Sequence, residues 1–115
     1  MRVLLCVGVV MGCLYGVALA KGQPVNNEKG AAVYRTNCVN CHGVNGKGDG
    51  PVAPNLIPPP ADLTSQVVQQ KNDQQLLKSI REGKAGTSMP AWKGDLSAQQ
   101  IEDVMAFVRT LGNQR

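Results

Sequence analysis

The sequence has few aromatic residues and one histidine. Phenylalanine, tyrosine and tryptophan account for 3% of its 115 residues, a length that favours a single domain. With so few large apolar side chains, the chain builds only a modest core, to which a buried apolar group would contribute much. The sequence also lacks arginine clusters interleaved with aromatic residues, so we expect no binding to nucleic acid.

The N-terminal segment has the layout of a secretory signal peptide. Arg2 and the amino terminus are positive, an uncharged stretch runs from Val3 to Val17, and Ala18-Leu19-Ala20 is a typical cleavage site. We therefore expect residues 1–20 to be a signal peptide and residues 21–115 to be one domain exported to the periplasm.

Two alternatives remain for this segment. The stretch from Val3 to Ala20 is close to the lower length limit for spanning a bilayer, which is also compatible with an uncleaved membrane anchor. A lipid attached to Cys13 is the other alternative, although the residues after Cys13 stay apolar. Cleavage would remove Cys6 and Cys13 and leave two thiols in the exported domain.

Those two thiols lie in the run Cys38-Val39-Asn40-Cys41-His42. Cys-x-x-Cys-His is the signature by which a c-type haem is attached to a polypeptide. Cysteines three residues apart lie on the same face of a helical turn, so both thiols can add to the vinyl groups of one porphyrin. His42 is then held beside the ring, where its imidazole can bind the iron.

Three other interpretations of this run are weaker. A structural zinc site needs four ligands, usually from two separated pairs, and here one pair adjoins a single histidine. A thioredoxin-type redox pair needs a βαβ context, which the sequence does not show. The third interpretation is a plain disulfide with an incidental histidine.

Iron bound by His42 has room for a second axial ligand, for which the exported domain offers two methionines. Met105 belongs to an apolar helical stripe, where packing explains it. Met89 lies in a loop beside Pro90, outside any such stripe. Because a thioether is a soft ligand suited to haem iron, we expect Met89 to be the sixth ligand.

The periodicity of apolar residues predicts four helices, at about residues 28–42, 62–70, 73–82 and 97–111. Asp73 is the expected N-cap of the third helix, and Ser97 with Gln100 forms a capping box before the last. The second helix is expected to bury Leu63, Val67 and Val68.

Glycine and proline dominate the stretches 43–60 and 83–94. At this density they exclude regular helix and central strand, so we expect two long loops. No other stretch predicts a strand, and the fold class is therefore all-α.

The sequence resembles the class I c-type cytochromes, specifically the small bacterial monohaem members. The matching segments are Gly30 to Tyr34, Cys38 to Gly43, Met89 to Trp92 and Ile101 to Leu111. This resemblance implies a cytochrome c fold, with about four short helices and two long loops around one covalently bound haem c.

The resemblance also implies particular contacts. The first and last helices should cross where Gly30 meets Phe107. The carbonyl of Pro54 should accept a hydrogen bond from Nδ1 of His42, which would fix the imidazole and tune the iron. Several prolines compete for that role.

The implied function is one-electron transfer in the periplasm, without catalysis, because His42 and Met89 leave the iron no open position. The partners would be a donor dehydrogenase or cytochrome complex and an acceptor oxidase or reductase. Alternatives are a cytochrome c subunit of a larger oxidoreductase complex, and a haem sensor or peroxidase with a labile methionine. Five lysines form either a docking ring or a solvated scatter: Lys47, Lys71, Lys78, Lys84 and Lys93.

Overall fold

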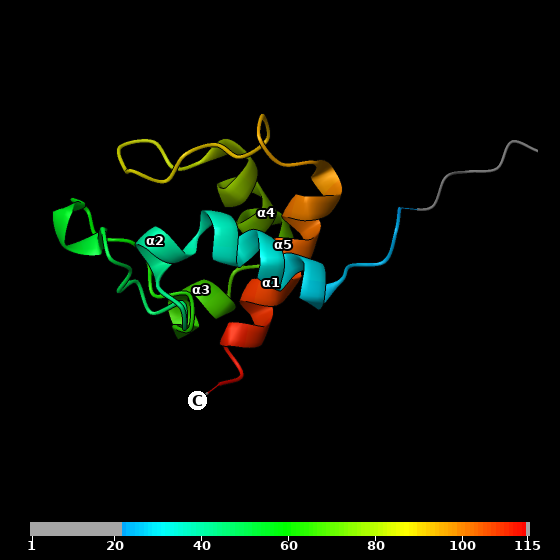
Figure 1. Ribbon diagram of the computed structural model, residues 1–115, viewed down its shortest axis with the longest axis horizontal. Coiled ribbons are helices and arrows are strands. Elements are labelled where there is room, and N and C mark those ends of the chain that lie inside the picture. The colour runs from blue at the N-terminus through cyan, green and yellow to red at the C-terminus, as the bar shows by residue number, and fades with distance from the viewer. Residues whose placement is uncertain (1–21, 115) are drawn as a thin grey trace, which may run out of the picture.

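The computed structural model describes residues 22–114, and the expected signal peptide lies outside them. Its elements in order are α1 (Asn27–Asn37), α2 (Val39–His42), the 3-10 turn η1 (Ala53–Asn55), α3 (Gln66–Gln69), α4 (Asp73–Glu82) and α5 (Ala98–Leu111) (Figure 1). The described residues contain helices and no strand, which confirms the all-α class. No helix among them is long and apolar enough to cross a membrane.

The first predicted helix is broken into two. α1 begins at the N-cap Asn26 and ends at Asn37, while α2 starts after Cys38. The side chain of Thr36 donates to the carbonyl of Ala32 at 3.1 Å, and that of Asn37 donates to the carbonyl of Val33 at 2.9 Å. Side chains that bond back to the preceding turn weaken and bend a helix, and two such bonds directly precede the break.

α1 lies across α5 (Figure 1), and the contacts of Gly30 with α5 place this residue at the crossing. A Cβ at this position would collide with the backbone oxygen of Asp103 and lie 3.1 Å from Cβ of Phe107. One turn further along α1, the Tyr34 ring packs against Phe107 with centroids 5.1 Å apart. The expected contact between a glycine and an aromatic residue is therefore confirmed, and the backbone of Asp103 comes closest of all.

Away from the crossing of α1 and α5, the helices α3, α4 and α5 share another group of buried residues. Its members are Val68, Leu76, Leu77, Ile101 and Met105. Met105 is packed within it, as the apolar stripe predicted. Val67 is 76% exposed, so the expectation that it is buried was wrong. α3 is a single turn, on which adjacent residues point in different directions, and Val68 takes the inward position.

Side-chain caps define where α4 and α5 begin. The capping box of Ser97 and Gln100 is present as predicted. In α4 the N-cap is Asn72, one residue before the predicted Asp73, because Asn72 forms its own capping box with Gln75. The carboxylate of Asp73 instead pairs with Arg109 of α5 at 2.7 Å.

The helix crossing gives a stability prediction. Gly30→Ala should lower the free energy of unfolding by about 2 kcal/mol, since overpacking at the crossing exceeds the gain of about 1 kcal/mol in helix propensity. Gly94→Ala is the matched control, because nothing lies within 4 Å of the added Cβ. Urea denaturation checks both variants, and equal loss of stability in the two would contradict the close approach.

Candidate functional site

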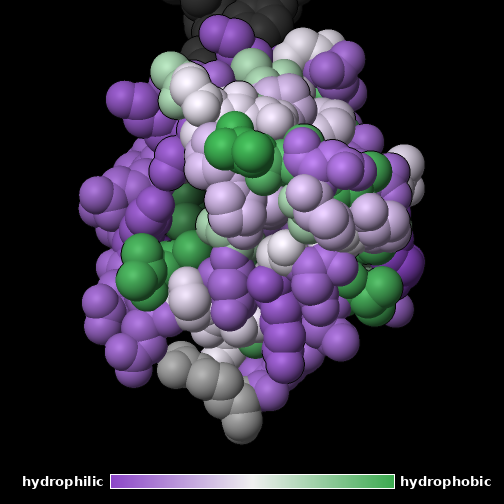
Figure 2. Space-filling model, turned by 90° about the vertical axis from the view of Figure 1, so that its left-hand side faces the viewer, coloured by the Kyte–Doolittle hydropathy of each residue, from purple (hydrophilic) through white to green (hydrophobic). Residues whose placement is uncertain are grey.

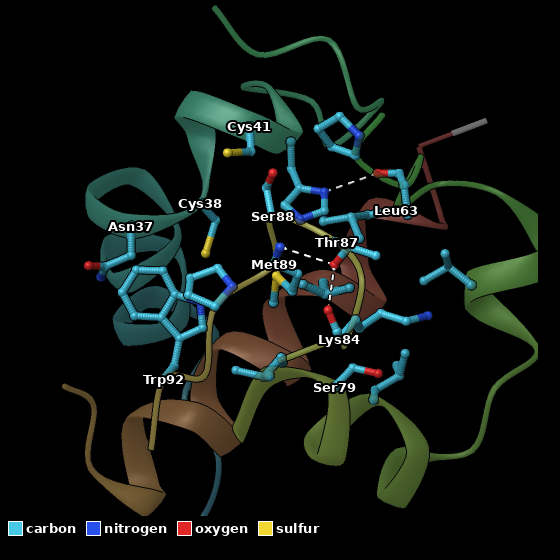
Figure 3. Close-up of a pocket in the computed structure, with 18 of the residues that line it drawn as sticks. Asn37, Cys38, Cys41, Leu63, Ser79, Lys84, Thr87, Ser88, Met89 and Trp92 are labelled. Atoms are coloured by element: carbon cyan, nitrogen blue, oxygen red, sulfur yellow. Dashed lines mark hydrogen bonds between the residues drawn. The ribbon is translucent and has the colours of Figure 1, made fainter. Parts of the chain in front are cut away.

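A cavity of about 450 Å³ lies between α1, α2, α4, α5 and the two long loops. Its volume is within the range of small-molecule and cofactor sites, about 300–1,000 Å³. Cys38, Cys41, His42 and Met89, predicted from separate parts of the sequence, all line it. Figure 3 shows three of these four side chains, Cys38, Cys41 and Met89, labelled around the cavity.

The walls between these four residues are mostly apolar. They are formed by side chains from α3, α4, α5 and the loops, among them Leu56, Leu63, Val68, Leu76, Ile80, Trp92, Val104 and Val108. Such a lining favours a ligand with a large apolar surface.

Cys38 and Cys41 are free thiols on the wall formed by α1 and α2. The amide of His42 donates to the carbonyl of Cys38 at 2.9 Å. This helical turn brings the two thiols to the same side. Burial, followed by the nearby Cys41, raises the pKa of the Cys38 thiol to about 11. Within residues 22–114, no three His, Cys, Asp or Glu side chains are grouped to hold a metal ion directly.

His42 is oriented by the carbonyl of Ala61, which lies 3.0 Å from Nδ1. A carbonyl only accepts, so Nδ1–H donates, and Nε2 of the neutral ring keeps its lone pair free. Burial lowers the pKa of His42 and favours that neutral form.

The prediction that Pro54 accepts this hydrogen bond was therefore wrong. Pro54 lies in η1 and lines a separate, shallower pocket with Gly48 and Asp49. The loop of Ala61 is held in place because the amide of Leu63 donates to the carbonyl of Gly46 at 2.6 Å.

Met89 lies in a short loop that closes on itself. The Thr87 hydroxyl donates to the carbonyl of Lys84 at 2.8 Å and accepts from the amide of Met89 at 3.1 Å. The amide of Lys84 donates to the carbonyl of Met89 at 3.2 Å. At Gly83, φ is +69° and a Cβ would lie 2.6 Å from that same carbonyl, so this position requires glycine. The backbone of Met89 is thus fixed from both sides (Figure 3).

Sequence reasoning missed three residues of the site. Ala61 and Thr87 act through the hydrogen bonds described above. Tyr34 donates from its hydroxyl to the carbonyl of Gly43 at 2.7 Å and so ties α1 to the residue after the motif. A threonine two residues before a loop methionine is a local turn signal, whereas nothing near Ala61 in the sequence marks it.

The fold and this site define a c-type cytochrome domain. A family model described as "Cytochrome C oxidase, cbb3-type, subunit III" matches residues 25–108. The chain belongs to this family.

Curated relatives agree with this assignment. The chain is 39% identical over 92 residues to the cbb3-type cytochrome c oxidase subunit FixP of Bradyrhizobium sp. (strain ORS 278), covering 78% of this chain and 29% of that protein. It is 33% identical over 101 residues to the cytochrome c subunit of a quinone alcohol dehydrogenase from Gluconacetobacter polyoxogenes, covering 80% and 20%. The chain therefore spans less than a third of the length of these relatives.

Solved structures show the same fold. The c-type cytochrome KustC0563 matches with a TM-score of 0.59 and 22% identity, covering 71% of this chain and 95% of that one. A chain of the Kuenenia stuttgartiensis reducing HAO-like protein complex matches with a TM-score of 0.66 and 24% identity, covering 76% and 43%.

The loop of Met89 gives a prediction that needs no cofactor assignment. Thr87→Val removes the acceptor of the Met89 amide, which should exchange its hydrogen about five- to tenfold faster, since one hydrogen bond contributes about 1 kcal/mol. Native-state hydrogen exchange followed by NMR measures this rate. Thr87→Ser keeps the hydroxyl and is the matched control. Equal rates in the wild type and the valine variant would contradict the role of the hydroxyl.

Proposed function

We propose that this chain is a one-electron carrier in which a single haem c is attached through Cys38 and Cys41, with His42 and Met89 as axial ligands. One observation carries the proposal. Four residues that the sequence places in two separate segments, the Cys38 to His42 motif and the Met89 loop, line the same apolar cavity. The membership of the cbb3-type subunit III family supports the choice of haem c.

The residues of the cavity fit the cofactor. Two thiols on one wall match the two vinyl groups of a porphyrin, the apolar lining matches its ring, and His42 presents an unprotonated Nε2. Bound there, the haem iron would supply the exchange of one electron between Fe(III) and Fe(II).

The protein's own contribution is to hold the two axial side chains still. The carbonyl of Ala61 orients the imidazole of His42, and the hydrogen bonds of Thr87 fix the backbone of Met89. When both ligands stay in place in both oxidation states, little rearrangement accompanies the electron. An iron with two strong protein ligands offers no position for a substrate, which supports a carrier over an enzyme or sensor.

A larger oxidoreductase is the partner that the relatives support. FixP is named as a subunit of a cbb3-type cytochrome c oxidase, and the other relative as a subunit of a quinone alcohol dehydrogenase. On the side of the molecule where α2 and η1 lie, hydrophobic residues are exposed among residues of intermediate hydropathy (Figure 2). Val52 and Ile57, which flank η1, are 39% and 93% exposed. Such side chains suit a protein contact.

The proposed location rests on the N-terminal segment. Residues 1–20 have the layout of a signal peptide, and we place the domain in the periplasm, either free or docked on a membrane complex. Size exclusion of native extract separates these two forms, since a docked subunit co-elutes with a catalytic partner.

Covalent attachment is tested by removing both thiols. Cys38→Ala with Cys41→Ala should abolish haem that survives denaturing electrophoresis, because no thioether can form. Met89→Ala should retain that haem and serves as the control. Haem that stays with the polypeptide in the double alanine variant would contradict attachment through Cys38 and Cys41.

The sixth ligand is tested by its effect on the iron. Met89→Ala should lower the reduction midpoint, since the lost thioether favours Fe(II), and should let the reduced protein bind carbon monoxide. Met105→Leu changes the other described methionine at nearly constant volume and should leave both properties unchanged. A redox titration followed by absorption spectra measures them, and an unchanged midpoint in Met89→Ala would assign the ligand elsewhere.

A further inference from the structure

The charges around the cavity are of one sign. Lys71 and Lys84 are the lysines that line it, and no aspartate, glutamate or arginine does so. Neither ammonium forms an ion pair in the described part of the chain, where the salt bridge present joins Arg109 to Asp73. Lys71 is half-buried and Lys84 is exposed, so solvent screens part of their attraction, but two cations with no acidic side chain in the lining still favour an anionic group at the cavity.

Both lysines come from segments of the chain outside the cysteine motif. Lys71 lies between α3 and α4, and Lys84 follows the end of α4. Figure 3 shows Lys84 and Ser79 across the cavity from Cys38 and Cys41. The backbone of Lys84 is fixed by its hydrogen bonds to Met89 and Thr87, which limits where its side chain can reach.

The arrangement of the substituents on haem relates the positions of the thiols to those of the lysines. The vinyl and propionate substituents lie on opposite edges of the porphyrin, so thioether bonds at Cys38 and Cys41 would turn both carboxylates toward the far wall. We infer that Lys71 and Lys84 form a carboxylate-binding subsite, in which the two ammonium groups pair with the two haem propionates. This inference rests on the proposed attachment of haem at Cys38 and Cys41.

The subsite has a measurable consequence for the iron. Nearby ammonium groups keep the propionates ionised, and without them the propionates take up protons at higher pH. A propionate that loses its proton adds negative charge beside the haem and favours Fe(III), so the midpoint falls as pH rises through its titration.

No other titratable group that lines the cavity would make the midpoint depend on pH in this range. The remaining titratable side chains that line it are Tyr34, Cys38, Cys41 and His42. In the haem-bound protein the cysteines are thioethers and the histidine is bound to iron. Burial raises the pKa of the Tyr34 hydroxyl, which keeps it neutral.

The test measures the reduction midpoint potential of the haem-bound protein from about pH 5 to 9. Propionates that are paired with lysine stay ionised over this range. The wild-type midpoint should be nearly independent of pH. Lys71→Met and Lys84→Met should each lower the midpoint at neutral pH and introduce a fall with rising pH. Infrared spectra of both variants should show a protonated carboxyl stretch at the acidic end, which the wild type lacks.

Matched controls separate the subsite from a general loss of charge. Lys78→Met removes the same charge from an exposed position on α4 that does not line the cavity, and its midpoint should stay independent of pH. Lys71→Arg and Lys84→Arg keep the charge and should restore the wild-type profile.

Two results overturn the inference. One is a flat profile in both methionine variants, and the other is an equal slope in Lys78→Met. If the midpoint becomes pH-dependent in only one of the two methionine variants, the inference that both lysines pair with propionates is overturned. These failures differ from failure of the proposed function, because absorption spectra show first whether the wild type carries covalent haem with a thioether ligand.

Discussion

The contact between α1 and α5 at Gly30 is the constraint on which the rest of the domain depends. It lets the two backbones approach closely enough for Tyr34 to pack against Phe107. The crossing is held at its N-terminal end by the buried Asp103, whose carboxylate accepts from the amide of Asn26 at 2.8 Å and from Gln99 at 3.0 Å. With α1 fixed at both ends, the Cys-x-x-Cys-His motif that follows it reaches the cavity in one orientation.

Helices and loops contribute different parts of the site. The helices bury the apolar residues, and the loops present Met89 and the carbonyl of Ala61. Loops can do so only when their backbones are restricted. Positive φ at Gly43 and Gly83, together with the hydrogen bonds of Thr87, supplies that restriction. The scarcity of regular structure in these stretches is therefore compatible with well-defined positions of Met89 and of the carbonyl of Ala61.

The sequence predicted what depends on neighbouring residues. The capping box of Ser97 and Gln100, the stripe of α5 and the cysteine motif are local patterns, and the structure contains all three. The errors concern contacts between distant segments. Nothing near Pro54 shows that it lies in a separate turn while Ala61 faces His42, since that depends on how the loops pack. The break at Cys38 was likewise hidden, because Cys38 lies on a continuous helical pattern.

The cavity also explains how a domain with so few aromatic residues holds together. One buried cluster contains Val68 and Leu76, the other contains Val104 and Val108, and all four residues line the cavity. A porphyrin bound there would contact both clusters at once and join them into one core. Thioether bonds would keep it on the chain in the folded and the unfolded state alike, so it would stabilise the fold through the apolar surface that it buries only in the folded chain. The same cofactor that moves electrons would then complete the fold.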